Sequence, residues 1–232
     1  MKQNDSRKAA PRQNRSAGEV LRHTLRAAAS LFVFAFGVYL TIQAGIGAAP
    51  WDVLNLGLSK SLGILYGTAS ITVSLSILAL DILLREPIGI AMLLDALVVG
   101  KSVDLFNVLG VVSRCSSPLF GIPLMLAGLV IMAFAQFFYM SSALGCGPRD
   151  TLLVALTKRA GRIPIGAISV AMLGTATLIG WLLGGPVGIG TLICAFCTGP
   201  IMQLAFYTVG FDATGVRHQR LIDSIRLLLT RR

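Results

Sequence analysis

The chain has 232 residues, of which 55% are hydrophobic and only 13% are charged, and its mean hydropathy is +0.78. Soluble domains contain about 25% charged residues, so this composition excludes a soluble domain and indicates a protein that crosses a membrane several times. The net charge of +10 could suit a nucleic-acid-binding protein, but the basic residues gather in the termini and loops, which leaves no folded basic face for a duplex.

The chain opens with a basic, polar segment over residues 1–26. Its first 20 residues lack an apolar pattern, which predicts a disordered cytoplasmic tail. A signal peptide cleaved near Gly47-Ala48-Ala49 is the alternative, but the apolar stretch before that site exceeds the roughly 7–15 residues of a signal peptide. We therefore expect the first apolar segment to stay in the protein.

Six apolar segments are long enough to cross roughly 30 Å of hydrocarbon at about 1.5 Å per residue. They are expected at residues 27–46, 64–84, 88–110, 119–141, 163–183 and 187–209. With the N-terminus in the cytoplasm, the only Lys or Arg residues in outer segments are Lys60 and Arg114. This distribution follows the positive-inside rule and predicts that both termini are cytoplasmic.

Residues 47–63, between the first two segments, are too short to cross a membrane and too apolar for a free loop. Pro50 interrupts the helix here, and a short apolar helix is expected after it. Irregular backbone at membrane depth is tolerated only where protein buries it or water fills a cavity. Asp52 could cap the short helix or belong to a polar binding site, and Trp51 fits an anchor at the outer interface.

The second segment contains Asp81, for which an ion pair with Arg85, four residues later, is expected. Ser70 and Ser74 fall on the same helix face as Asp81. Such a stripe is more typical of hydrogen bonds to a neighbouring helix than of a pore lining.

The third segment contains Asp95, Lys101 and Asp104 in an otherwise apolar run. A charge at this depth costs about 2.5–3.5 kcal/mol on insertion scales. Lys101 and Asp104 are expected to pair on one face, whereas Asp95 faces the other side and needs another partner or a proton. A pair that fixes helix register and a role in proton or ion coupling both stay open, and the equivalent of Asp104 in the sixth segment is Gln203.

A second interruption follows the fourth segment, at Gly147 and Pro148. Asp150 again comes two residues after the proline and has the same two interpretations, capping or binding. Arg149 takes the place of Trp51. It either follows the positive-inside preference or points inward, where it could bind an anionic substrate bidentately.

The two interruptions belong to a repeat. Ala49-Pro-Trp-Asp recurs 98 residues later as Gly147-Pro-Arg-Asp, and Pro87-Ile-Gly-Ile recurs 99 residues later as Pro186-Val-Gly-Ile. Each copy has three apolar segments, and because three is odd, the second copy enters the membrane from the other side. The predicted fold is therefore an all-α membrane protein of about six transmembrane helices, arranged as 3+3 inverted-topology repeats with interrupted segments, an architecture common among secondary transporters.

These repeats are predicted over residues 27–113 and 118–209. After them, residues 217–232 place apolar side chains at helical spacing beside arginines, which predicts an amphipathic cytoplasmic helix on the anionic inner leaflet. A helix that binds a partner protein is the alternative.

The sequence contains few groups of residues that could form a catalytic or metal site. Cys194 and Cys197 form a C-x-x-C spacing inside an apolar run without a neighbouring His or second cysteine pair, and are interpreted as packing residues. Both histidines, His23 and His218, lie outside the six segments, and the sequence shows no nucleophile–base or metal constellation. We expect no enzyme activity, no metal and no cofactor.

Several motifs resemble the YczE/YyaS/YitT family of bacterial integral membrane proteins, closest to its YczE-like branch. They are Gly47-Ala-Ala-Pro-Trp-Asp-Val-Leu, Gly145-Cys-Gly-Pro-Arg-Asp and Trp181-Leu-Leu-Gly-Gly-Pro-Val-Gly-Ile-Gly-Thr. The resemblance implies a location in the prokaryotic cytoplasmic membrane. It implies no established substrate and no catalytic residue.

The paired interruptions favour a small transporter or permease with its site at the interface of the two repeats. The predicted substrate-binding residues are Pro50, Trp51, Asp52, Pro148, Arg149 and Asp150. The predicted ion-coupling or helix-pairing residues are Asp95, Lys101, Asp104 and Gln203. The alternative is a non-transporting membrane partner that supports a neighbouring transport or biosynthetic system. Expected partners are the lipid bilayer, anionic inner-leaflet lipids and a small solute, without nucleic acid, and a homo-oligomer stays open.

Overall fold

The structure, a computed structural model, describes residues 17–142, 144 and 147–211. This part of the chain is all α-helical and contains no strand. Its eight helices are α1 (Ala17–Gln43), α2 (Pro50–Leu62), α3 (Tyr66–Leu83), α4 (Ile90–Leu109), α5 (Pro118–Met140), α6 (Pro148–Ala160), α7 (Ile165–Leu182) and α8 (Ile189–Thr208).

Five of these helices are long and apolar enough to cross a membrane, namely α1, α3, α5, α7 and α8. Helix α4 has 20 residues, as many as α8, but it contains Asp95, Lys101 and Asp104. Each of the six predicted segments therefore coincides with a long helix, and the prediction of apolar spans is confirmed for five of them.

Helix α1 begins at Ala17, well before the predicted start of its segment at residue 27. Val20 and Ala27 are fully buried, so the end of the stretch predicted as a tail packs with the helices that follow. Residues 1–16 and 217–232, where the rest of the tail and the amphipathic helix were predicted, lie outside the described residues.

The two short helices α2 and α6 follow the predicted interruptions, and each has 13 residues. Both begin with proline in the first turn, where the missing N–H costs no hydrogen bond. The residues at the cap positions are Ala49 and Gly147, and neither provides a side-chain cap. Asp52 and Asp150 are therefore not the cap residues themselves, but both lie in the first turn, where the helix dipole favours a carboxylate.

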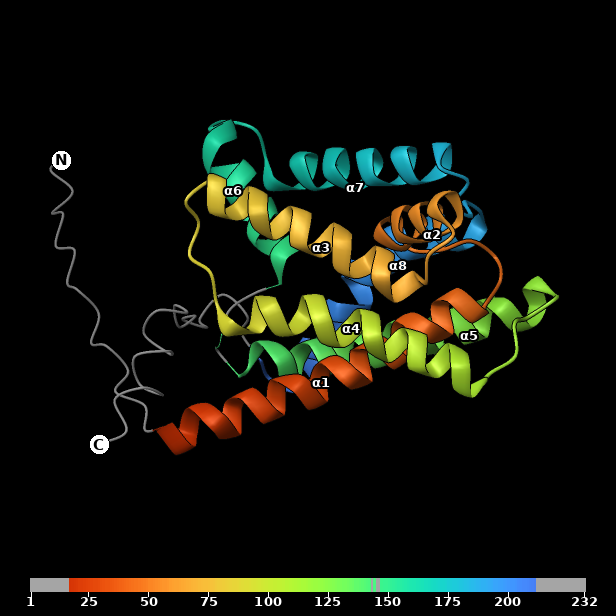
Figure 1. Ribbon diagram of the computed structural model, residues 1–232, viewed down its shortest axis with the longest axis horizontal. Coiled ribbons are helices and arrows are strands. Elements are labelled where there is room, and N and C mark those ends of the chain that lie inside the picture. Colours follow the sequence, from red (N-terminus) through yellow and green to blue (C-terminus); the bar gives the residue numbers. More distant parts are fainter. Residues whose placement is uncertain (1–16, 143, 145–146, 212–232) are drawn as a thin grey trace, which may run out of the picture.

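The order of the helices repeats between the two halves of the chain. Helices α2, α3 and α4 have 13, 18 and 20 residues, and α6, α7 and α8 have the same lengths. Helix α1 packs on α4 as α5 packs on α8, and α2 packs on α7 as α6 packs on α3. Helices α1 and α5 pack against each other, and the short helices α2 and α6 lie toward opposite ends of the bundle (Figure 1).

Glycines bring several helix pairs close together, as is common between membrane helices. A Cβ on Gly57 of α2 would lie 2.3 Å from the carbonyl oxygen of Gly180 on α7. A Cβ on Gly37 of α1 would lie 2.8 Å from the carbonyl oxygen of Gly128 on α5. The main apolar core lies beside this second contact, where α1, α4 and α5 enclose Tyr39, Phe106 and Tyr139.

Candidate functional site: a cavity between the two helix breaks

A cavity of about 410 Å³ lies where the first turns of α2 and α6 meet. Its size is typical of small-molecule sites, which span about 300–1,000 Å³. Its polar and charged wall is formed by Trp51, Asp52, Tyr66, Ser70, Ser74, Asp95, Gln136, Arg149, Asp150, Ser169 and Thr198. Apolar side chains from α1, α4, α5, α7 and α8 form most of the remaining wall.

Irregular backbone supports the cavity on two sides, through equivalent hydrogen bonds. The Gly190 N–H donates to the Ile46 carbonyl at 2.8 Å, and the Ala91 N–H donates to the Leu144 carbonyl at 3.4 Å. These two pairs correspond to each other at the offsets of the sequence repeat. The interruption before α2 therefore contacts the start of α8, and the interruption before α6 contacts the start of α4.

Gly47 shows why the first interruption needs glycine. Its φ is +117°, a region that side chains with a Cβ rarely adopt. A Cβ there would also lie 2.7 Å from the backbone nitrogen of Gly188. The repeated glycine motifs thus allow two backbone segments to touch beside the cavity.

Asp52 is buried and held by a hydrogen bond from α3. The Tyr66 hydroxyl donates to its Oδ1 at 2.6 Å, and the Asn55 side-chain amide donates to the Tyr66 hydroxyl at 3.4 Å. Asp52 is only 4% exposed. This explains why Asp52 does not cap α2: a tertiary donor on another helix occupies its carboxylate.

Trp51 and Arg149, which are equivalent residues of the repeat, contact each other at the cavity. The Arg149 guanidinium carbon lies 5.1 Å from the centre of the Trp51 ring, within the range of a cation–π interaction. Of the two interpretations of Arg149, the inward orientation is therefore the one observed. Trp51 lines the same cavity, a position different from the interfacial anchor predicted for it.

Asp95 and Asp150 line the cavity, and both carboxylates lie near Gly147. A Cβ on this glycine would lie 3.3 Å from Oδ2 of Asp95 and 3.7 Å from Oδ2 of Asp150. Among the described residues, neither carboxylate has an ion pair, and neither does Arg149, whose buried Nε also lacks a hydrogen-bond partner. The cavity thus contains opposite charges that do not contact each other.

The serine stripe of α3 continues the cavity wall. Ser70 and Ser74 are buried and line the cavity, which is the less typical of the two roles considered for this stripe. Asp81 lies further along α3, fully buried, and neither of its carboxylate oxygens has a partner among the described residues. The predicted Asp81–Arg85 ion pair is absent there, because α3 ends at Leu83 and Arg85, at φ +58°, has left the helical register.

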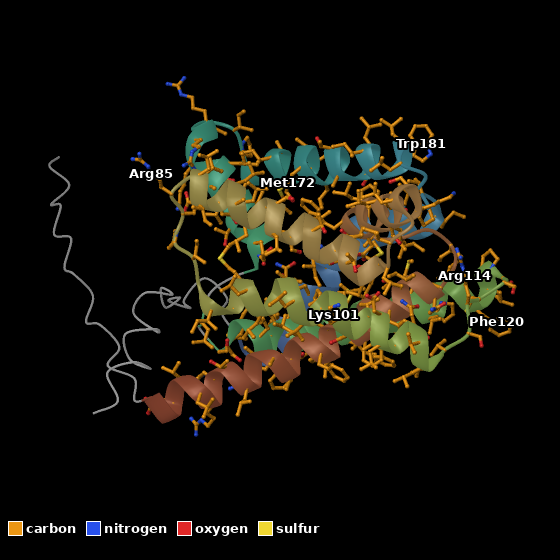
Figure 2. The ribbon with its side chains drawn as sticks, in the orientation of Figure 1. Arg85, Lys101, Arg114, Phe120, Met172 and Trp181 are labelled. Atoms are coloured by element: carbon orange, nitrogen blue, oxygen red, sulfur yellow. The ribbon has the colours of Figure 1, made fainter. Side chains whose placement is uncertain are left out.

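The predicted Lys101–Asp104 pair is also wrong for the described chain. Asp104 Oδ1 accepts the backbone N–H of Gly67, in the first turn of α3, at 2.7 Å. Leu65, at the cap position of α3, offers no acceptor, so a carboxylate from α4 replaces the missing cap. Lys101 is exposed midway along α4 (Figure 2). Neither residue lines the cavity.

Two other predicted residues also fall outside the cavity lining. Gln203 is exposed on α8, and Pro148 is buried at the start of α6. The structure adds Tyr66, Gln136 and Tyr139 to the wall. Single aromatic or amide side chains in apolar helices give no distinct sequence signal, so only the packing of the helices identifies them.

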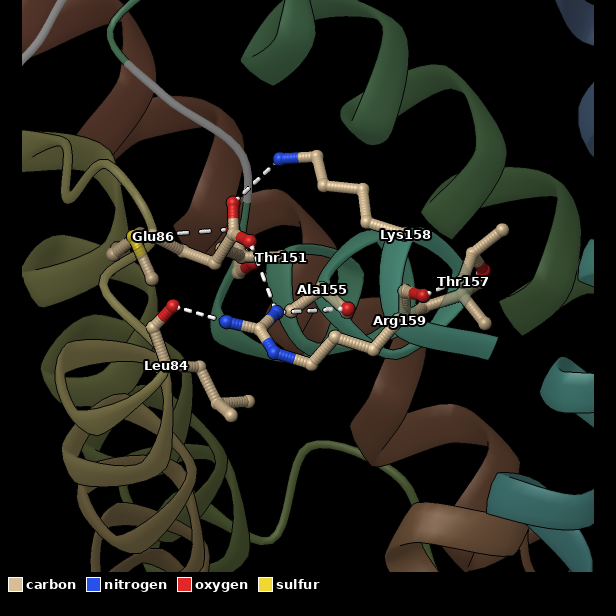
Figure 3. A network of polar contacts seen from close by, with 10 residues as sticks. Leu84, Glu86, Thr151, Ala155, Thr157, Lys158 and Arg159 are labelled. Atoms are coloured by element: carbon tan, nitrogen blue, oxygen red, sulfur yellow. Dashed lines mark hydrogen bonds and ion pairs between the residues drawn. The ribbon is translucent and has the colours of Figure 1, made fainter. Parts of the chain in front are cut away.

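A polar clamp that the sequence did not predict connects the loop after α3 to α6 (Figure 3). Glu86 accepts from Lys158 Nζ at 2.6 Å and from Arg159 Nη1 at 3.3 Å. Arg159 also donates to the carbonyl oxygens of Leu84 and Ala155. The hydrogen bond from Lys158, aided by Arg159, lowers the pKa of Glu86 against the opposing effect of burial.

A second cavity, of about 480 Å³, lies on the other side of the first interruption. Its lining includes Gly47 and Ala48, together with Lys60 and Arg114, the two cations predicted to face outside. Arg114 and Arg85 lie at opposite ends of the bundle (Figure 2). Gly47 and Ala48 line this cavity, and Ala49 and Pro50 line the first, so the interruption borders both.

The described cysteines make no metal site. The Cys194 thiol is buried beside the cavity and donates to the Met125 sulfur at 3.8 Å, and Cys115 and Cys197 are also free thiols. Cys146 lies outside the described residues. Within the described ranges, no three His, Cys, Asp or Glu side chains gather as metal ligands would.

Comparison with known proteins identifies relatives without an assigned function. A family of unknown function, DUF6198, matches residues 21–206. The uncharacterized membrane protein YczE of Bacillus subtilis (strain 168) is 32% identical over 180 residues, which cover 76% of this chain and 82% of YczE. YyaS of the same organism is 27% identical over 187 residues, covering 77% of this chain and 89% of YyaS.

A third relative, an uncharacterized protein of Haemophilus influenzae, is 29% identical over 178 residues, covering 75% of this chain and 78% of that protein. No solved structure matches the chain. The five apolar helices and the name of YczE agree that this is a membrane protein. The resemblance drawn from the interrupted motifs is thus confirmed, and the chain belongs to the DUF6198 family.

Proposed function

We propose that this protein is a small-solute transporter of the bacterial cytoplasmic membrane, built from two inverted repeats, and that the cavity between α2 and α6 is its solute site. The observation that carries the proposal is the meeting of equivalent residues from both halves at one cavity. Trp51 and Arg149 touch there, and Asp52 and Asp150 line it. Transporters with inverted repeats bind solute in this way, between discontinuous helices at the repeat interface.

The arrangement of the helices supports the inverted relation. The short helices α2 and α6 lie toward opposite ends of the bundle (Figure 1), as an odd number of spans per repeat requires. The equivalent hydrogen bonds from Gly190 to Ile46 and from Ala91 to Leu144 give the two interruptions the same environment. An inverted pair of repeats explains both features with one two-fold axis.

A difference between the halves supports alternating access. Gly67 of α3 touches Gly100 of α4, where a Cβ would lie 2.3 Å from the Gly100 carbonyl oxygen. A Cβ on either of the equivalent glycines, Gly166 of α7 and Gly199 of α8, would meet no atom of another helix within 4 Å in the described part of the chain. Since α7 and α8 both line the cavity, we infer that solute passes between them in this conformation. In the opposite conformation, α7 closes on α8 while α3 separates from α4.

Flux through reconstituted vesicles tests the function. Labelled leucine, putrescine, glucose and inorganic phosphate are offered to vesicles that contain the wild type, Asp52→Asn or Asp150→Asn. We expect saturable uptake of at least one solute and a loss of about tenfold or more in both variants. Lys101→Gln, outside the cavity, is the matched control and keeps the wild-type rate. Uptake no faster than in protein-free vesicles for all four solutes contradicts the proposal.

Cross-linking tests the alternation without knowledge of the solute. Gly166→Cys and Gly199→Cys are combined in a variant whose four native cysteines are replaced by alanine. Because a disulfide needs Cα atoms within about 7 Å, the pair joins only when α7 closes on α8. We expect oxidation to link the pair and to stop flux, and a reductant to restore it. If the variant keeps full flux under oxidation and no disulfide between the two introduced cysteines is detected, the proposed closure of α7 on α8 is wrong.

A further inference from the structure

We propose that the cavity binds a small zwitterion, a molecule with an ammonium group, a carboxylate and an apolar body, as in an apolar amino acid. This inference rests on the proposed function and specifies the class of solute. It is argued from the charges of the cavity, which come from α2, α4 and α6, and from its apolar wall.

The charged side chains of the cavity fall into two groups, one that already has a hydrogen-bond partner and one that has no ion pair. Asp52 already accepts the Tyr66 hydroxyl at 2.6 Å and is 4% exposed, so it belongs to the wall. Asp95, Asp150 and Arg149 line the cavity without an ion pair within 4.0 Å among the described residues. The Arg149 Nε is buried and has no hydrogen-bond partner among residues 17–142, 144 and 147–211. Asp150 is exposed, and Asp95 and Arg149 are partly buried, so all three are accessible to a ligand. Charged groups that lack a direct ion pair are the groups that a ligand of matching charge would satisfy.

The arrangement of these groups selects a ligand with both signs of charge. The Oδ2 atoms of Asp95 and Asp150 both lie close to Gly147, so an ammonium bound there has two carboxylates nearby. Arg149 is held over the Trp51 ring, with its planar guanidinium available to a carboxylate. A simple cation would leave Arg149 unpaired, and a simple anion would leave two carboxylates unpaired. A zwitterion pairs all three residues.

The remaining wall fits an uncharged, apolar body. Leu129, Met132 and Ala133 of α5, with Leu173 of α7 and Met202 of α8, line the cavity. These side chains favour aliphatic or aromatic carbon over polar groups. A cavity of about 410 Å³ holds one amino acid of ordinary size and excludes a folded peptide.

Binding of three leucine derivatives to the full-length protein in lipid nanodiscs tests the charge requirement. L-leucine has both charges, L-leucinamide keeps only the ammonium, and N-acetyl-L-leucine keeps only the carboxylate. We expect leucine to bind at least about tenfold more tightly than either derivative, because each lost charge-assisted hydrogen bond removes a factor of this size. If leucinamide binds as tightly as leucine or more tightly, this is a cation site. If N-acetyl-leucine does so, it is an anion site. If none of the three binds, the proposed class of ligand is wrong. Each of these results overturns the proposal.

Charge-changing variants test the assigned roles. Arg149→Gln should lose leucine binding at least about tenfold and keep leucinamide binding, whereas Arg149→Lys should retain part of the leucine affinity. Asp95→Asn should weaken leucine and leucinamide together. Lys101→Gln is the control, and the thermal midpoint of each variant shows that it is folded. Equal losses of leucine and leucinamide in Arg149→Gln contradict the role given to this side chain.

The binding and flux experiments separate this inference from the proposed function. Leucine that binds to nanodiscs but does not enter vesicles supports the zwitterion site and contradicts transport. A solute of another class that enters vesicles, when leucine neither binds nor competes, supports transport and overturns the zwitterion.

Discussion

Equivalent glycines make a close helix contact in the first half of the molecule but not in the second. In the first half, Gly67 and Gly100 bring α3 and α4 into close contact, whereas in the second half Gly166 and Gly199 make no such contact with any described residue. Half of the α3 span is buried, against 11% of the α7 span. Glycines at equivalent positions therefore allow two helices to approach closely, but whether they do so depends on the other side chains.

Asp104 is the side chain that distinguishes the closed seam from the open one. Its carboxylate accepts the Gly67 N–H across the α3–α4 contact, and an ionised acceptor strengthens such a bond. The equivalent residue in the second half, Gln203, is exposed. A neutral amide binds a helix N-terminus less strongly than a carboxylate does, so we expect Gln203 to hold α7 and α8 together less strongly than Asp104 holds α3 and α4.

The largest effect is expected from adding methyl groups to the closed seam. Gly67→Ala and Gly100→Ala force the new Cβ against backbone carbonyls and should each destabilise the protein by about 2–3 kcal/mol. Gly166→Ala and Gly199→Ala, the matched controls, should keep or raise stability, since alanine favours a helix by up to about 1 kcal/mol. Thermal unfolding in detergent measures all four. Equal losses in both halves would show that the seams do not differ.

A smaller loss is expected when the acceptor at the seam is removed. Asp104→Ala leaves the Gly67 N–H unpaired and should cost about 1–2 kcal/mol, and Asp104→Asn, which keeps an acceptor oxygen, should cost less. Gln203→Ala, at the equivalent position, should be neutral. Thermal unfolding of Lys101→Met distinguishes the two roles of Asp104. If Asp104 pairs with Lys101, the variant should be less stable than the wild type. If Asp104 caps α3, as observed, the stability should not change.

The sequence predicted features set by neighbouring residues better than features set by distant ones. Pro50 and Pro148 break helices through their own geometry, and α2 and α6 begin at these residues. The sequence predicted that Asp104 and Asp81 pair with cations three and four residues away. Instead, Asp104 accepts a backbone N–H of another helix, and α3 ends between Asp81 and Arg85. The repeat marked Trp51 and Arg149 as equivalent, but only the fold brings them into contact.

The helix crossings offer a second comparison between the halves. Gly180, where α7 crosses α2, has its counterpart in Asp81, where α3 packs on α6, at the offset of 99 residues. The first crossing is closed by backbone contact with Gly57, and the second buries a carboxyl group without a partner among the described residues. Buried unpaired polar groups oppose folding, so residues of this kind in membrane helices commonly serve function.

Replacing Asp81 should therefore raise stability and lower activity. We expect Asp81→Asn to gain about 1 kcal/mol in thermal unfolding and to slow any flux that the wild type catalyses. Ser76→Ala, on an exposed face of the same helix, is the control and should change neither quantity. A loss of stability in Asp81→Asn would mean that the carboxylate is satisfied and has a structural role.

The smallest effect is expected at the Glu86 clamp, because Lys158 and Arg159 are 58% and 45% exposed and solvent weakens such pairs to about 1 kcal/mol or less. Glu86→Gln should lower stability by this amount at neutral pH. Since the folded protein lowers the pKa of Glu86 from its ordinary 4.5, the contribution is complete above that value and is lost as the pH falls through the folded pKa. The difference in thermal midpoint between wild type and Glu86→Gln should therefore be constant from neutral pH to about 5.5 and shrink below about 4.5. A difference that grows on acidification would mean that Glu86 is stabilised in its protonated form, and the clamp would then not hold α6 to the loop after α3.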